Sequence, residues 1–143
     1  MVPSMEIAWR EPFRSSEVNA LHAACFDARR YSEDEWDWTR LCDRHSLGWA
    51  SARTDGVLVG FANVLWDGFT HAWLQDVMVS PAVRRAGVGT RLVQVACDRA
   101  DAAGCEWLHV DFEEHLRPFY LGACGFTATQ AGLIRLGQGV APD

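Results

Sequence analysis

The residues of this chain whose types and spacing could do chemistry lie in one short stretch, Arg84-Arg85-Ala86-Gly87-Val88-Gly89-Thr90. An amphipathic segment, predicted to be helical from about Val88 to Ala103, begins inside this stretch. The first turn of a helix leaves backbone N–H groups without intrahelical acceptors, and the helix dipole adds partial positive charge there. Gly87 and Gly89 let a ligand approach the backbone closely, and two arginines lie beside the turn. The stretch therefore predicts a site for a phosphate or pyrophosphate.

Two common phosphate-binding motifs do not fit the stretch. A P-loop requires a lysine after its second glycine, but all 13 basic residues of this chain are arginine. A dinucleotide-binding fingerprint requires a third glycine, but Leu92 occupies that position. Both departures count against one possible function of the chain, that of a nucleotide-binding α/β protein with a P-loop or a dinucleotide-binding fold.

The pattern Arg84-x-x-Gly87-x-Gly89 follows an apolar strand that ends in Val79-Ser80-Pro81. It resembles the acetyl-CoA-binding motif of the GNAT superfamily of N-acetyltransferases, in which Gln or Arg is followed at the same spacing by Gly and then by Gly or Ala. The resemblance implies transfer of an acetyl group from acetyl-CoA to a primary amine by direct attack, with CoA as product and no metal. It further implies that ten residues bind acetyl-CoA: Val77, Met78 and Val79 along the strand, and Arg84, Arg85, Ala86, Gly87, Val88, Gly89 and Thr90 around the pyrophosphate.

The same resemblance implies an acid beside the leaving thiolate, and family members often use a tyrosine on the last helix. Tyr120 matches, but Gly125 follows it by five positions where the family has four, and one residue is about 100° of helix turn. A packed ring whose hydroxyl bonds to the backbone is the alternative for Tyr120. Asp76 and Glu113 are candidates for the base that deprotonates the amine, and Glu114, His109 and His115 are further candidates. Their alternatives are a structural hydrogen-bond acceptor at Asp76 and a solvated loop carboxylate at Glu113.

The elements expected to position these residues form a single GNAT-like α+β domain over residues 1–143. We predict a central mixed, mostly antiparallel sheet of six or seven strands flanked by about four helices. A helical crossover makes two of the strands parallel, and the resemblance implies that these two strands splay apart. The expected strands are Met5–Trp9, Leu47–Arg53, Val57–Trp66, His71–Val79, Trp107–Phe112, Phe126–Thr129 and Leu133–Leu136; the expected helices are Ser15–Ala28, Ser32–His45, Val88–Ala103 and Leu116–Cys124.

Composition narrows the class of protein. The net charge of −6 argues against non-specific nucleic-acid binding, which relies on basic patches. We find no apolar run near the length of a membrane span and no secretory signal, so the expected location is the cytoplasm. The five cysteines have no metal-binding spacing, and buried free thiols are their expected state.

The sequence says less about the acceptor amine and the partners than about the cofactor. In the resembled family the first two helices build the acceptor pocket, and Trp36, Trp38 and Trp49 lie in or near that region. They would favour an aromatic or extended apolar amine on a small molecule or peptide, with ordinary core packing as the alternative. Many relatives form dimers, so a homodimer through the apolar C-terminal strands is a further expectation. The competing function is a non-catalytic acyl-CoA-binding module of the same fold.

Overall fold

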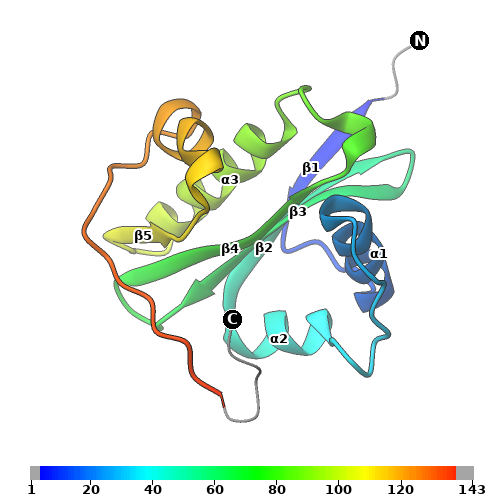
Figure 1. Ribbon diagram of the computed structural model, residues 1–143, viewed down its shortest axis with the longest axis horizontal. Helices are drawn as coiled ribbons and strands as arrows, with labels where there is room; N and C mark the ends of the chain where they lie inside the picture. Colours follow the sequence, from blue (N-terminus) through cyan, green and yellow to red (C-terminus); the bar gives the residue numbers. More distant parts are fainter. Residues whose placement is uncertain (1–3, 138–143) are drawn as a thin grey trace.

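The computed structural model (Figure 1) describes residues 4–137 and has a five-stranded sheet at its centre. The strands lie side by side in chain order, β1-β2-β3-β4-β5. Neighbours from β1 to β4 are antiparallel, whereas β4 and β5 are parallel because a helical crossover joins them. The strands are β1 (Met5–Trp9), β2 (Ser46–Thr54), β3 (Val57–Trp66), β4 (His71–Val79) and β5 (Trp107–Val110).

Helices cover both faces of the sheet. Figure 1 shows α1 and α2 on one face, and α3 with the helical segment after β5 on the other. The predicted amphipathic pattern of α3 is confirmed, because Val88, Leu92 and Ala96 are buried along it. The helices are α1 (Ser15–Phe26), α2 (Trp38–His45), α3 (Val88–Ala102), the short 3-10 helices η1 (Pro81–Val83) and η2 (Glu114–Leu116), and the π-helix η3 (Pro118–Ala123).

The central strand β3 fixes where α3 begins. It is buried on both faces, as its nearly continuous apolar sequence predicts. Val64 belongs to the core under α3, and Phe61 belongs to the core under α1 and α2. A Cβ on Gly60 would lie 3.0 Å from Leu92 Cδ1 and 3.1 Å from Val88 Cγ1. The missing side chain therefore lets the first turns of α3 pack directly on the sheet.

The second helix begins later than predicted. The expected capping box forms, since Glu35 Oε1 accepts a hydrogen bond from Ser32 N at 3.0 Å and Glu35 N donates to Ser32 Oγ at 3.3 Å. It closes only a turn, and α2 starts at Trp38, where Asp37 caps the helix. Ser15 Oγ, on α1, accepts a hydrogen bond from Trp38 N at 2.8 Å. This contact with α1 explains why the helix starts at Trp38.

The prediction of six or seven strands was wrong, because neither C-terminal segment forms a strand. Residues Phe126–Thr129 and Leu133–Leu136 are extended but pair with no strand within residues 4–137. The side chains of Leu133, Ile134 and Leu136 are 93%, 79% and 81% exposed. A strand needs a neighbour for its backbone groups and a surface on which to bury its side chains. The apolar sequence supplies neither of these.

The parallel strands separate near the middle of β4. Their pairing runs from His71 with Trp107 to Leu74 with Val110, and β4 then continues alone on this side to Val79. On its other side β4 has an irregularity in its pairing with β3, and Asp76 lies there with φ of +57°. The bulge and the short β5 leave the end of β4 with an unpaired edge.

Candidate functional site

The two glycines at the start of α3 have different roles. Gly87 precedes the helix with φ of +77°, in the left-handed region that glycine adopts without strain, and the space beside it is open. A Cβ on Gly89 would lie 3.1 Å from Cζ of Phe119, so this glycine lets η3 pack closely against α3. Both roles keep side-chain bulk away from the helix start.

The first turn of α3 presents backbone N–H groups that precede its hydrogen-bond ladder. Arg91 N donates to Gly87 O at 3.1 Å, so the N–H groups of Val88, Gly89 and Thr90 lie before the first such bond. The helix dipole adds partial positive charge at the same place. The start of α3 therefore presents both backbone donors and a field that favours an anion.

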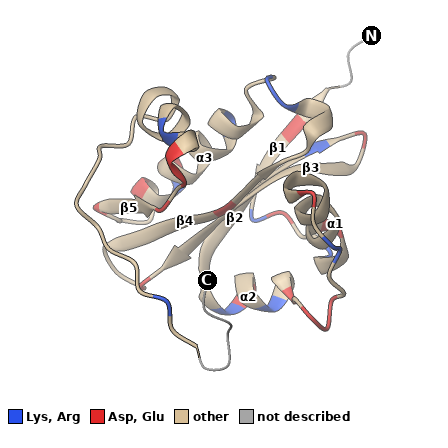
Figure 2. Ribbon diagram, viewed as in Figure 1, with Lys and Arg blue, Asp and Glu red and all other residues tan. Residues whose placement is uncertain are grey.

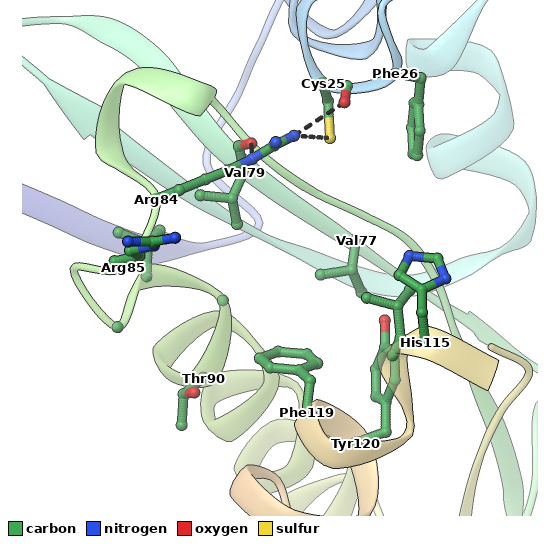
Figure 3. A pocket seen from close by; sticks show the side chains of 14 residues that line it. Cys25, Phe26, Val77, Val79, Arg84, Arg85, Thr90, His115, Phe119 and Tyr120 are labelled. Carbon is green, nitrogen blue, oxygen red and sulfur yellow. Dashed lines mark hydrogen bonds between the residues drawn. The ribbon is translucent and has the colours of Figure 1, made fainter. Parts of the chain in front are cut away.

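The two arginines ahead of α3 point in different directions (Figure 3). The Arg84 guanidinium donates to the carbonyl of Val79 at 3.3 Å and to the carbonyl of Cys25 at 2.9 Å. It thereby ties the end of β4 to the end of α1. Arg85 has φ of +69° and lines the cavity beside the helix start. Figure 2 shows basic residues, in blue, on the loop that leads into α3.

A cavity of about 620 Å³ lies between the end of β4, the start of α3 and η3. It contains eight of the ten residues expected to bind the cofactor; Met78 and Ala86 do not line it. Met78 is 1% exposed and packs in the core under α1 and α2, so its backbone alone is available to the β4 edge. The lining residues are Cys25, Phe26, Val77, Val79, Arg84, Arg85, Gly87, Val88, Gly89, Thr90, His115, Leu116, Phe119 and Tyr120.

Tyr120 lies on the wall opposite β4, and its hydroxyl points into the cavity (Figure 3). Its ring is 6% exposed, stacked on Phe112 at 5.1 Å between centroids. Burial raises the pKa of Tyr120 to about 12, so the hydroxyl stays protonated at neutral pH. The extra residue before Gly125 is accommodated because η3 is a π-helix, in which Cys124 N donates to Phe119 O.

Asp76 lies at the bulge of β4, one residue before Val77, which lines this cavity. It lines a separate gap of about 220 Å³ between the diverging strands, together with Trp73 and Asp111. Burial raises the pKa of Asp76, and the Asn63 amide and the His22 ring oppose that shift. A carboxylate in this position can accept a proton more readily than a solvated aspartate.

The structure does not bring Glu113 into either cavity. Its side chain is 82% exposed and lies 3.4 Å from His115 Nδ1. Of the three predicted catalytic residues, Tyr120 and Asp76 therefore line two separate cavities beside β4, whereas Glu113 is solvated and lines neither.

Comparison with protein families gives a match over residues 6–126 to the family described as acetyltransferase (GNAT) family. The chain belongs to this family. A comparison with curated proteins found no match.

Solved structures of acetyltransferases share this GNAT fold. An acetyltransferase from Trypanosoma brucei is 24% identical with a TM-score of 0.77, over 94% of this chain and 99% of that one. A GNAT family protein from Streptococcus pneumoniae is 22% identical with a TM-score of 0.75, over 94% and 99%. An aminoglycoside N-acetyltransferase in complex with CoA is 18% identical with a TM-score of 0.72, over 96% and 97%. At these sequence identities the similarity to the solved structures shows the fold alone.

This GNAT chain also places residues at the site that the sequence pattern did not single out. Phe26, at the end of α1, lines the cavity although it is 55% exposed, and no periodic pattern marks it. His22 lies four positions after the buried Val18, on the same face of α1, so helical spacing could have found it. Asp111 directly follows β5 and lines the gap between the diverging strands. Its place at the end of a strand that separates from its neighbour could have marked it in the sequence.

The three tryptophans expected near the acceptor have separate positions. Trp38 is 3% exposed and donates from Nε1 to Asn19 Oδ1 at 2.9 Å, and Trp49 is 8% exposed and donates to Glu11 O at 2.8 Å. Both are core residues. Trp36 is 48% exposed and remains available to a ligand.

Within residues 4–137 no helix is long and apolar enough to cross a membrane. The same residues contain no group of three or more His, Cys, Asp or Glu side chains arranged to hold a metal ion.

Proposed function

We propose that this protein transfers the acetyl group of acetyl-CoA to a primary amine by direct attack of the amine on the thioester. One observation carries the proposal. A single cavity joins the free N–H groups of α3, the unpaired edge of β4 and the buried hydroxyl of Tyr120. These supply an anion site, an amide-binding edge and an acid within one volume of about 620 Å³.

The chain's own groups divide the binding of acetyl-CoA between backbone and side chains. The N–H groups from Arg85 to Thr90 would hold the pyrophosphate, and the Arg85 guanidinium would add charge. The backbone of Val77 to Val79 would pair with the amides of the pantetheine arm. The side chains of Val77 and Val79 line the cavity and supply its apolar wall.

Proton movement in the proposed reaction follows from the two perturbed groups. A C–N bond forms as the C–S bond breaks, so the amine must lose a proton and the thiolate must gain one. Tyr120 would donate to the sulfur, because its raised pKa keeps the hydroxyl protonated. Asp76 would receive the amine proton directly or through water, because burial raises its pKa toward that of a useful base. Glu113, which is solvated, would at most attract a cationic amine toward the cavity.

The π-helix bears on the competing function. A misplaced Tyr120 would fit a non-catalytic acyl-CoA-binding module. Because η3 is a π-helix and accommodates one extra residue, the spacing of Tyr120 is compatible with the catalytic proposal. The proposed acceptor remains a small-molecule or peptide amine.

The proposal is tested by following CoA thiol release from acetyl-CoA in the presence of small primary amines and amine-bearing peptides. We expect amine-dependent release that exceeds slow hydrolysis. CoA binding without turnover on any amine would favour the binding module instead. Binding that ATP or NAD competes for would favour an unrelated nucleotide-binding protein.

A further inference from the structure

Two histidines meet on a part of the sheet that lies outside both cavities. His71 opens β4 and His109 is the third residue of β5, and Figure 1 shows these two strands side by side. Trp73 pairs directly with His109, and residues two apart share a face of a strand. His71, Trp73 and His109 therefore project from the same face of the sheet. Neither histidine lines the cofactor cavity or the gap beside Asp76.

The facing nitrogens of the two imidazole rings are in direct contact. His71 Nδ1 lies 2.8 Å from His109 Nε2, with the ring centroids 5.1 Å apart and the ring planes tilted by 23°. A hydrogen bond at this distance needs an N–H on one nitrogen and a lone pair on the other. A neutral imidazole carries its proton on either nitrogen, so moving the donor's proton to its far nitrogen leaves a lone pair on both facing nitrogens. The pair can then hold one ion without a change of charge on either ring.

The spacing of these nitrogens is close to that of two ligands on one transition-metal ion. Imidazole nitrogens lie about 2.0–2.1 Å from Zn²⁺, so two of them at an angle of about 90–110° are about 2.9–3.4 Å apart. The two nitrogens, 2.8 Å apart here, would have to separate by roughly 0.1–0.6 Å. A rotation of the two surface side chains achieves this and turns both lone pairs toward the ion.

The surroundings of the pair restrain the rings and favour a cation. The Trp73 ring centroid lies 5.1 Å from that of His109 and 6.1 Å from that of His71, with both pairs of planes within 26° of parallel. This packing lowers the side-chain entropy that the rings lose when they bind an ion. Asp67 Oδ1 accepts a hydrogen bond from His71 N at 3.2 Å, and Asp111 lines the gap next to Trp73. Two carboxylates therefore place negative charge beside the pair.

We propose that His71 and His109 bind one divalent transition-metal ion of the class that prefers imidazole ligands, such as Zn²⁺ or Ni²⁺. Two nitrogen ligands disfavour Mg²⁺ and Ca²⁺, which prefer oxygen. Within residues 4–137 no cluster of three such ligands forms, so water fills the remaining positions of the ion. The ion links β4 to β5 where they are paired, and it stabilises the folded chain because it binds that state alone.

The test is a titration of the full chain with Zn²⁺ in competition with a chromophoric chelator, with the thiols kept reduced by a phosphine. We expect one ion per chain with micromolar affinity. His71→Gln and His109→Gln should each weaken binding roughly 10-fold or more, because a single imidazole remains. His45→Gln removes an exposed histidine at the end of α2, outside the pair, and should leave the affinity unchanged.

A residue-specific measurement separates this site from the five free thiols. Long-range proton–nitrogen NMR spectra report each imidazole nitrogen, and Zn²⁺ should shift Nδ1 of His71 and Nε2 of His109 but not the ring of His45. Absence of micromolar binding, binding that shifts neither ring of the pair, or equal affinity in both glutamine variants would overturn the inference.

The spectra use the unchanged chain, so they decide the matter even if a variant fails to fold. Neither acetyl-CoA nor an amine enters the titration. The failure of the metal site is therefore distinguishable from the failure of the proposed acetyl transfer.

Discussion

The two sides of the candidate site are built differently. The cofactor side comes from one continuous stretch, β4 through the Arg84–Thr90 loop into α3, and it offers mainly backbone N–H and C=O groups. The acceptor side, as we assign it, is assembled from separate segments. Asp76 comes from the bulge of β4, Asp111 from the end of β5, and His22, whose charge acts on Asp76, from α1.

This difference has a consequence for how each side tolerates change. A backbone anion site needs only the right turn and the absence of bulk, so most substitutions leave it intact unless they add a side chain or a charge. A site made of side chains depends on each residue's identity. Substitutions on the first side should therefore act on CoA affinity, and those on the second should act on turnover and on its pH dependence.

The largest effect is expected from Gly87→Glu, which places bulk and negative charge against the helix start. We expect CoA affinity to fall at least 100-fold, measured by titration calorimetry. The control is Gly68→Glu in the β3–β4 turn, where φ is +82° and the space is also open. Both variants carry similar backbone strain, so the control separates strain from loss of the binding site. Unchanged CoA affinity in Gly87→Glu would contradict the assignment of an anion site at the start of α3.

Tyr120→Phe should separate binding from chemistry. Loss of a general acid typically costs about 10²-fold or more in rate, whereas the ring and its stacking on Phe112 remain. We expect turnover to fall by about that factor with CoA affinity unchanged. Tyr31→Phe, on the α1–α2 connection, is the control and should keep its rate. A normal rate in Tyr120→Phe would show that another group acts as the general acid.

Asp76→Asn should lower activity while raising stability. Asparagine keeps the shape and tolerates the positive φ of +57°, so the change mainly removes a titrating group. The folded-state pKa of Asp76 is raised, so its contribution to stability is present at low pH and is lost as the pH rises through that pKa. At pH 7 the variant should therefore melt at a higher temperature than the unchanged chain.

This gain from Asp76→Asn should shrink as the pH falls through the raised pKa of Asp76 and vanish below the ordinary aspartate range, where the carboxyl is neutral in both the folded and the unfolded chain. The acid limb of the pH–rate profile should disappear in the same variant, with turnover about tenfold lower at neutral pH. Melting curves and rates across pH check both statements. Normal turnover together with the raised melting point would make Asp76 a structural residue.

The smallest effect on CoA affinity is expected from substitutions of Arg84 and Arg85, and the two should differ. Both arginines line the cavity, but the Arg84 guanidinium already donates hydrogen bonds to the carbonyls of Val79 and Cys25. We expect Arg85→Gln to weaken CoA binding about tenfold, as for the loss of one charge-assisted hydrogen bond. Arg84→Gln should have a smaller effect on CoA affinity. The reverse order of the two affinities, measured by the same titration, would contradict the assignment.

Much of the sheet was predictable from local signals. Strands β1, β3 and β4 have the predicted bounds because alternating or continuous apolar runs end at clear turns, such as Asp55-Gly56. The loop before α3 was predictable for the same reason, since its glycines and the helix that follows are adjacent in sequence.

The remaining features depend on contacts between distant segments. The capping box at Ser32 formed, but a bond from Trp38 to Ser15 set the helix start. The C-terminal segments had strand-like sequences but no strand beside them. The π-helix that carries Tyr120, and the folding of α1 that lets the charge of His22 act on Asp76, have no local signature. The acceptor side is therefore the part of the site that sequence patterns predicted least.

The most direct test of the central claim is a calorimetric titration of the purified protein with acetyl-CoA and with CoA. The proposed cavity predicts binding of both in the micromolar range, with one ligand per chain, and loss of that binding in Gly87→Glu. Absence of binding to either ligand would contradict the account, and the Arg84–Thr90 loop would then be a packing turn between β4 and α3.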